Sequence, residues 1–183
     1  ALIVDVGSTT VDVVPIAAGR VVAAGRTDLD RLLAGELVYT GSLRTNLAAI
    51  APRVPVRGSA CPVASELFAI SADAHLILGH LTPAEYSCAT PDGRPATLEF
   101  ARERVARLVC ADAEQLAVGE IDAIAAFLHS EQVNQIEAAV QRVSARLGGD
   151  RPHGGHPRQA GGEGQGPSRA RGAPGQHPGS RDR

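Results

Sequence analysis

The first sixteen residues constrain the fold more than any other stretch of the chain. An apolar run over residues 1–4 leads into Asp5, and a second apolar run surrounds Asp12. Four small residues, 7–10, with the sequence Gly-Ser-Thr-Thr, separate the two runs. Short β-branched segments on either side of such a turn predict two antiparallel strands joined by a tight loop.

The turn has the composition of a phosphate-binding loop. Gly7 gives the backbone conformational freedom, and Ser8, Thr9 and Thr10 supply hydroxyls beside backbone N–H groups. Such a loop can wrap a phosphate with backbone donors. Asp5, at the strand end, would hold a hydrated Mg²⁺. The alternative is an ordinary hairpin whose turn contains these residues by chance, because short glycine motifs often match by chance.

Composition narrows the class of protein. The 183 residues allow one domain or little more, and the net charge of −2 gives no case for nucleic acid or an anionic membrane as a partner. Three widely spaced cysteines do not form a disulfide framework, so we expect a cytoplasmic protein with reduced thiols. Because the chain has no Met, we expect Ala1 to lie inside a longer protein.

Residues 17–147 predict a third strand followed mainly by helices. The short helix after residue 27 would bury Leu29, Leu32 and Leu33. The predicted segments are a strand at 21–25, a helix at 28–35, a strand at 37–41, a helical turn at 45–50, an edge segment at 54–56, and helices at 62–78, 96–110 and 119–147.

The last 36 residues, 148–183, have a different composition. They are rich in Gly, Pro and Arg and contain no Val, Ile, Leu or Phe, so we predict a disordered tail. An Arg/Gly segment can bind RNA, but this one has no aromatic residue for stacking and no regular repeat. The alternative is a stretch read out of frame in a GC-rich gene.

The pattern Asp-x-Gly-Ser-Thr-Thr-x-Asp over 5–12 resembles the phosphate-binding hairpin of the actin, hexokinase and Hsp70 ATPase superfamily. Together with segments 25–45, 61–69 and 72–79, it resembles the hydantoinase/oxoprolinase-related family linked to tetrahydromethanopterin and one-carbon transfer. The resemblance covers 1–147. It implies an α/β, ribonuclease-H-like (actin-like ATPase) lobe: a three-stranded antiparallel meander followed by helices.

The resemblance also implies an activity. The family includes the synthase of the furan-methanamine part of methanofuran, which transfers a furan-methyl group and releases pyrophosphate. The implied ligands are Mg²⁺ and either ATP or a pyrophosphate-bearing substrate, and the implied partner is a first lobe preceding Ala1. Without that lobe, we expect the chain to be incompetent alone. The alternatives are a subunit of an ATP-dependent hydantoinase or oxoprolinase, and a non-catalytic module that binds nucleotide or acts through assembly.

In this interpretation Asp5 and Asp12 position Mg²⁺, while Gly7, Ser8, Thr9 and Thr10 hold the phosphates. Two further pairs are candidates, each with a structural alternative. Arg26 and Arg44 could clamp a phosphate, or they could lie on the surface. Glu66 and Asp73 could face one cleft from the predicted 62–78 helix, or they could be partnered at a helix contact.

Four residues, Cys61, His75, His80 and Cys88, could in principle bind zinc. Their spacing matches no standard pair-and-pair zinc template. Buried cysteines and ordinary histidines are therefore the favoured interpretation.

Overall fold

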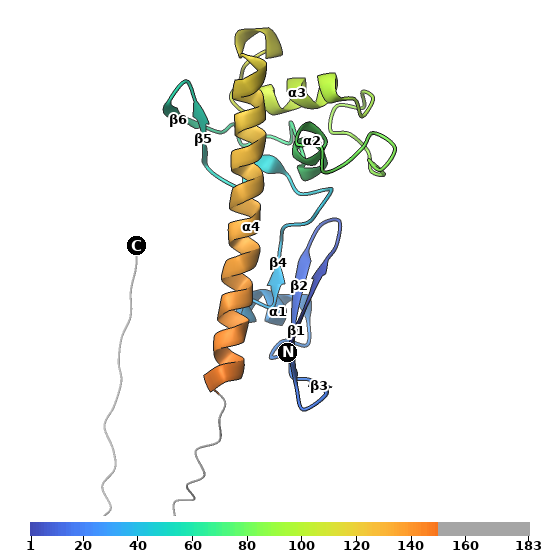
Figure 1. Cartoon of the computed structure of the whole chain (residues 1–183), viewed down its shortest axis with the longest axis vertical. Coiled ribbons are helices and arrows are strands. Elements are labelled where there is room, and N and C mark those ends of the chain that lie inside the picture. Colours follow the sequence, from blue (N-terminus) through green and yellow to red (C-terminus); the bar gives the residue numbers. More distant parts are fainter. Residues whose placement is uncertain (150–183) are drawn as a thin grey trace, which may run out of the picture. The chain divides into compact units, whose positions relative to one another are not determined.

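The computed structural model describes residues 1–149 of the chain. The final helix ends at Gly149, so the predicted tail from residue 148 lies almost wholly outside the described residues. In the described part, strands at the N-terminal end are followed mainly by helices (Figure 1). This is the mixed α/β arrangement of antiparallel strands and helices that the sequence predicts.

The predicted N-terminal hairpin is present, and its second strand is the centre of the sheet. This strand pairs antiparallel with each of the other three strands. The third and fourth strands are shorter than predicted, at two residues each. The strands are β1 (Leu2–Val6), β2 (Val11–Ala17), β3 (Arg20–Val21) and β4 (Leu37–Val38).

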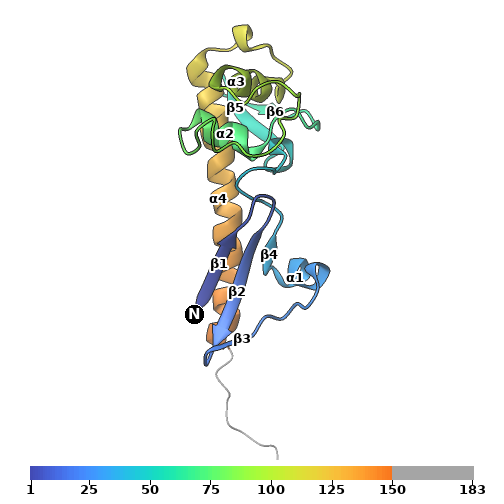
Figure 2. The ribbon, with the colours of Figure 1, turned by 90° about the vertical axis from the view of Figure 1, so that its right-hand side faces the viewer.

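One face of β2 packs on the long helix α4 (Val118–Gly149). Val11 and Val13 are fully buried, and Val13 forms an apolar cluster with Ala139 and Val143 of α4. Figure 2 shows the hairpin lying alongside this helix. The alternation of side chains along a strand therefore turns Asp12 to the opposite face of the sheet.

The helix α1 (Asp28–Ala34) forms where predicted. Thr27 caps its first turn, and Gly35 ends it in the left-handed conformation. The predicted burial of its leucines is wrong, because Leu29 and Leu33 are 65% and 80% exposed. The side of α1 that faces the sheet carries Arg31 instead, and the Arg31 guanidinium pairs with Asp12 on the face of the sheet opposite α4.

The helix predicted over 62–78 is wrong in its first half. Residues 59–62 form a strand, and 63–70 contain no helix. Cross-strand pairing of Cys61 with Val54 draws this segment into a second hairpin. The helix starts only where the Asp73 carboxylate accepts a hydrogen bond from the Ile70 N–H. The elements are β5 (Arg53–Val56), β6 (Ser59–Pro62) and α2 (Ser71–Ile77).

The predicted helical turn at 45–50 and the predicted helices at 96–110 and 119–147 are present with shifted ends, whereas the short helix at 113–115 was not predicted. The main core lies where α4 meets α2, α3 and β5, and it includes Leu47, Leu108, Ile124 and Leu128. Among residues 1–149, no helix combines the length and the apolar character needed to cross a membrane. These elements are η1 (Leu47–Ala49), α3 (Leu98–Arg107) and η2 (Ala113–Gln115).

Candidate functional site

The turn at residues 7–10 is held by a second loop, residues 40–45, which we call the bracing loop. The Ser42 N–H donates to the Gly7 carbonyl at 2.9 Å. The Ser8 carbonyl accepts from the Arg44 N–H at 2.8 Å and from the Leu43 N–H at 3.1 Å. Three backbone hydrogen bonds therefore fix the turn against a segment more than thirty residues away.

Gly41 allows the two loops to meet. A Cβ atom at this buried position would lie 2.4 Å from the Thr9 nitrogen and 2.6 Å from the Ser8 carbonyl carbon. Both of those atoms belong to the backbone, which cannot move aside as a side chain can. The close approach of the turn therefore depends on glycine at position 41.

The bracing loop is anchored in turn to two helices. The Gln132 side chain of α4 donates to the Thr40 hydroxyl at 2.8 Å and to the Gly41 carbonyl at 2.7 Å. The Thr45 N–H donates to the Ser71 hydroxyl of α2 at 3.2 Å. The sequence analysis missed Gln132, although a polar residue buried within an apolar helical pattern was an available signal.

The turn presents donors on its free side. The Arg44 guanidinium donates to the Ser8 hydroxyl at 2.8 Å, and that hydroxyl lies 3.5 Å from the Thr9 hydroxyl. Within residues 1–149, the N–H groups of Ser8 and Thr10 have no hydrogen-bond acceptor. The hydroxyls and N–H groups of the turn, with the guanidinium of the bracing loop beside them, are the donors that a phosphate group requires.

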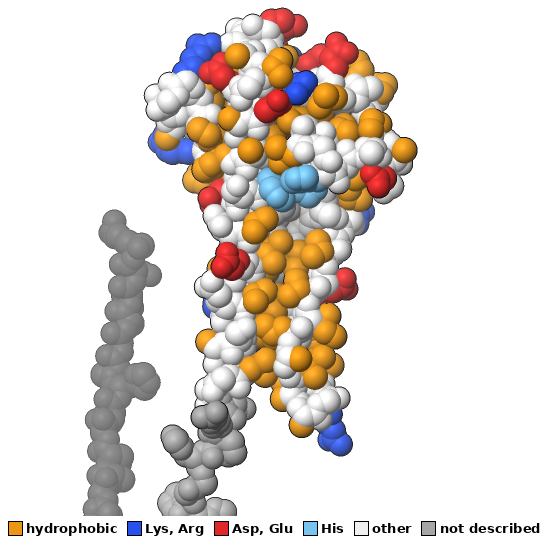
Figure 3. Space-filling model, in the orientation of Figure 1, with side chains coloured by type: hydrophobic (Ala, Val, Ile, Leu, Met, Phe, Trp, Pro, Cys, Tyr) orange, Lys and Arg blue, Asp and Glu red, His pale blue; other side chains and the backbone are white. Residues whose placement is uncertain are grey.

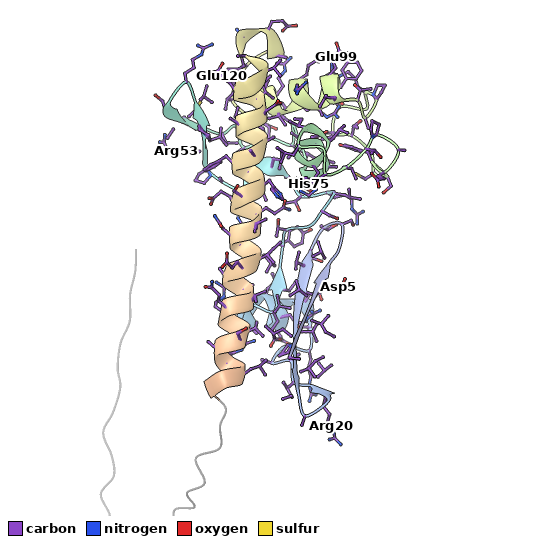
Figure 4. All side chains as sticks on the ribbon, in the orientation of Figure 1. Asp5, Arg20, Arg53, His75, Glu99 and Glu120 are labelled. Atoms are coloured by element: carbon purple, nitrogen blue, oxygen red, sulfur yellow. The ribbon has the colours of Figure 1, made fainter. Side chains whose placement is uncertain are left out.

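Asp5 and Asp12 lie directly opposite each other in the β1–β2 pair, so their side chains share the outer face. Asp12 is engaged by the Arg31 guanidinium at 2.5 Å. Asp5 is exposed, has no ion-pair partner among the described residues, and projects away from α4 (Figure 4). Asp5 is therefore the freer of the two carboxylates to hold a cation, and Arg31 is a contact that the sequence analysis missed.

The structure does not bring the other predicted acids and Arg26 into this site. Arg26 is exposed just before α1, and no contact joins it to the turn in the described part of the chain. Glu66 is exposed in the non-helical segment 63–70, whereas Asp73 is buried in α2. The shared helical face predicted for Glu66 and Asp73 is wrong, because no helix joins them.

Asp73 is a partnered carboxylate between helices. It accepts hydrogen bonds from the Arg104 guanidinium at 2.6 Å and from the Tyr86 hydroxyl at 2.9 Å. Asp73 is fully buried, and Arg104 is 2% exposed. Burial raises the pKa of the Asp73 carboxyl, and the hydrogen bonds from Arg104 oppose that rise. This geometry is the structural alternative that the sequence left open, and a catalytic role for Asp73 stays a prediction.

Three histidines from separate segments form a cluster near the bracing loop. His75 lies in α2, His80 follows that helix, and His129 lies in α4. Their ring centroids are 4.8 to 5.8 Å apart. Figure 3 shows the imidazoles as a continuous patch on the surface. The sequence analysis combined His75 and His80 with cysteines, because no spacing rule links them to His129.

In the absence of added metal ions, we expect the folded protein to lose stability as the pH falls from 7 to 5. Burial, followed by repulsion from His129 and His80, lowers the pKa of His75 from 6.5 to about 4, and burial lowers the pKa of His129. The unfolded chain then binds protons at a higher pH than the folded chain, so stability present above pH 6.5 is lost toward pH 4. With solvent screening, we expect a loss of about 1–2 kcal/mol.

Thermal unfolding in a chelator buffer checks this expectation. His75→Asn should show a flatter dependence of Tm on pH between 7 and 5 than the unaltered chain. Equal slopes for the two proteins would contradict the assignment to His75.

Comparison with known proteins places these features in a family context. Residues 1–166 match the family described as hydantoinase/oxoprolinase. Over 147 residues the chain is 38% identical to the (4-{4-[2-(gamma-L-glutamylamino)ethyl]phenoxymethyl}furan-2-yl)methanamine synthase of Methanococcus vannielii, covering 80% of this chain and 66% of that protein. The synthase of the same name from Methanocaldococcus jannaschii is 39% identical over 145 residues, covering 79% of this chain and 44% of that protein. The chain thus spans just under two thirds of one relative and less than half of the other.

Proposed function

Because the chain belongs to the hydantoinase/oxoprolinase family, we propose that its turn at residues 7–10 binds the phosphates of a Mg²⁺-bound polyphosphate. The proposed reaction is transfer of a furan-methyl group with release of pyrophosphate, as part of methanofuran synthesis. The contact between Arg44 and the Ser8 hydroxyl carries the proposal, since it puts the guanidinium of the bracing loop beside the hydroxyls of the turn.

The names of the relatives support the reaction type. Their product is a phenoxymethyl furan, in which a phenol oxygen is joined to a methylene on the furan ring. Forming that carbon–oxygen bond by displacement breaks the bond from the methylene to a leaving oxygen, and the phenol proton passes to solvent. Pyrophosphate is a leaving group that the donors of the turn suit. Arg44 and a Mg²⁺ ion at Asp5 would stabilise the charge that develops as it departs.

The proposal includes the finer fold assignment and a partner. The β1–β2–β3 meander followed by helices supports a ribonuclease-H-like lobe. A further lobe, corresponding to the part of the relatives that this chain does not span, would close over the phosphorylated substrate. The proposed ligands are therefore Mg²⁺ and a pyrophosphate-bearing furan held between two lobes.

Calorimetric titration of the chain with Mg²⁺-pyrophosphate tests the site. We expect Asp5→Asn and Arg44→Gln each to weaken Mg²⁺-dependent binding about 10- to 100-fold, since each removes a charged partner of the ligand. Glu99→Gln and Arg57→Gln remove the same charges from exposed positions on α3 and the β5–β6 turn and should bind as the unaltered chain does. Equal binding by Asp5→Asn, or no binding either by this chain or by a protein restored with the missing lobe, would contradict the proposal.

A second candidate follows from the family description, which names hydantoinases and oxoprolinases. In that case the turn would hold the phosphates of ATP in an ATP-dependent amidohydrolase subunit. Titration with Mg²⁺-ATP under the same conditions separates the two candidates. Tighter binding of ATP than of pyrophosphate would favour the amidohydrolase, and failure of both ligands would leave a module that acts through assembly.

A further inference from the structure

The histidine cluster has the chemistry of a metal site that is separate from the phosphate-binding turn. His75, His80 and His129 each offer one ring nitrogen, and the three nitrogens all lie within 4.8 Å of one another. We propose that these three imidazoles bind a divalent transition-metal ion of the zinc class.

Two unpaired nitrogens favour a ligand over simple ring packing. His75 Nε2 and His129 Nδ1 are buried and have no hydrogen-bond partner among the described residues. A buried polar atom without a partner destabilises the folded protein. Edge-to-face packing brings the rings together but leaves both nitrogens without a partner among the described residues. A shared cation would use both.

The protonation state of the cluster suits a metal. A histidine binds a metal ion through the lone pair of its neutral ring. The lowered pKa values of His75 and His129 keep these rings neutral at pH 7.

The arrangement can reach ligand geometry with a small movement. Tetrahedral zinc holds imidazole nitrogens at about 2.0–2.1 Å, which places two ligands about 3.3 Å apart. His75 and His129 are fixed by their helices, whereas His80 is exposed beyond the end of α2. Rotation of the His80 side chain can therefore close the site, and three protein ligands leave a fourth position for water or another ligand.

The donor set decides which ion would bind. The described group contains three nitrogen donors and no carboxylate or thiolate. Imidazole ligands suit Zn²⁺, Co²⁺, Ni²⁺ and Cu²⁺, whereas Mg²⁺ requires oxygen ligands. The cluster is therefore chemically distinct from the proposed Mg²⁺ position at Asp5.

The site also contacts the support of the turn. His75 lies near the Ser42 backbone and the Gln132 side chain; Ser42 belongs to the bracing loop, and Gln132 holds it. An ion joining α2 to α4 at this level would tie together the two helices to which the bracing loop is anchored. Metal binding should therefore raise the thermal stability of the chain.

The experiment needs a background free of other histidines. His153, His156 and His177 lie outside the described residues and could bind metal independently, so all three are replaced by Asn in the full chain. Titration with Co²⁺, followed by visible absorption, and with Zn²⁺, followed by calorimetry, should give one ion per chain. His80→Gln and His129→Gln should each weaken binding about 100-fold or more, because loss of an outer partner alone costs 10- to 100-fold.

The Co²⁺ affinity of the His80→Gln variant is the decisive measurement. His80 is exposed, so its variant should keep the fold, and circular dichroism verifies this. Unchanged Co²⁺ affinity in His80→Gln, or no binding in the tail-substituted background, would overturn the site. Thiolate-to-metal absorption bands would also overturn it, because they would assign the ion to cysteine. Asp5→Asn should bind Co²⁺ normally, which separates this inference from the proposed phosphate site.

Discussion

Gly41→Ala should displace the turn from the bracing loop and abolish Mg²⁺-pyrophosphate binding by the chain. The added methyl would lie 2.4 Å from the Thr9 nitrogen at a buried position, so one of the two backbones must shift. Overpacking of this kind costs about 1–3 kcal/mol. The shift would also break the geometry that puts Arg44 on the Ser8 hydroxyl. Thermal unfolding and calorimetric titration measure the two effects.

Gly119→Ala is the matched control for this substitution. Gly119 lies in the first turn of α4, and a Cβ atom there meets nothing within 4 Å. Alanine favours a helix over glycine by up to about 1 kcal/mol, so this variant should be as stable as the unaltered chain or more so. If Gly41→Ala had the same unfolding temperature and the same ligand affinity as Gly119→Ala, the inferred close contact between the two loops would be contradicted.

Arg104→Met should produce the largest loss of stability among single substitutions considered for this chain. It removes the guanidinium from the fully buried Asp73 carboxylate, leaving that charge with only the Tyr86 hydroxyl and one backbone N–H. Breaking one side of a buried ion pair costs about 3–5 kcal/mol. Denaturant unfolding measures the change in the free energy of unfolding.

Arg107→Met on the same helix is the control. Its ion pair with Asp112 is exposed, at 60% and 61% for the two side chains, and should contribute no more than about 1 kcal/mol. Adding Asp73→Asn to Arg104→Met should recover part of the loss, because the unpaired buried charge is then removed as well. Strictly additive losses in the double variant would show that the two residues do not act as a pair.

The elements that the sequence predicted well are those fixed by neighbouring residues. The β1–β2 hairpin follows from its turn, and α1 follows from the Thr27 cap and the Gly35 end signal. The helix predicted over 62–78 failed because distant partners decide that segment. Pairing of Cys61 with Val54 forms a strand, which no periodicity within 62–78 reveals.

The predicted burial of the α1 leucines was wrong for a related reason. The spacing of Leu29, Leu32 and Leu33 describes an apolar stripe, but a stripe does not identify the neighbour that would cover it. In the structure, α1 contacts β4 and directs Arg31 to Asp12 across the outer face of the sheet. An ion pair between residues in different elements leaves no local signature in the sequence.

The same division holds for the candidate site. The turn and Arg44 could be recognised because their residue types suggest phosphate chemistry wherever they lie. The helical pattern could have marked Gln132 as an inward-facing polar residue, but neither Gln132 nor His129 could be assigned to this site, because they reach it from a helix about ninety residues beyond the bracing loop. Helical periodicity predicts that α4 exists, but the identity of the elements packed on each of its turns is a property of the fold.

Helix α4 fixes the directions in which its two contact residues, Gln132 and Arg146, point around the helix axis. Gln132 holds the bracing loop, and Arg146, farther along the helix, bonds the buried Glu36 carboxylate at 2.6 Å. Each residue of an α-helix advances about 1.5 Å and turns about 100° around the axis. Insertion or deletion of a single residue between Gln132 and Arg146 would therefore point one of them away from its partner. Substitutions on the outer side of α4 leave these directions unchanged, so the helix tolerates changes of sequence there but not changes of length.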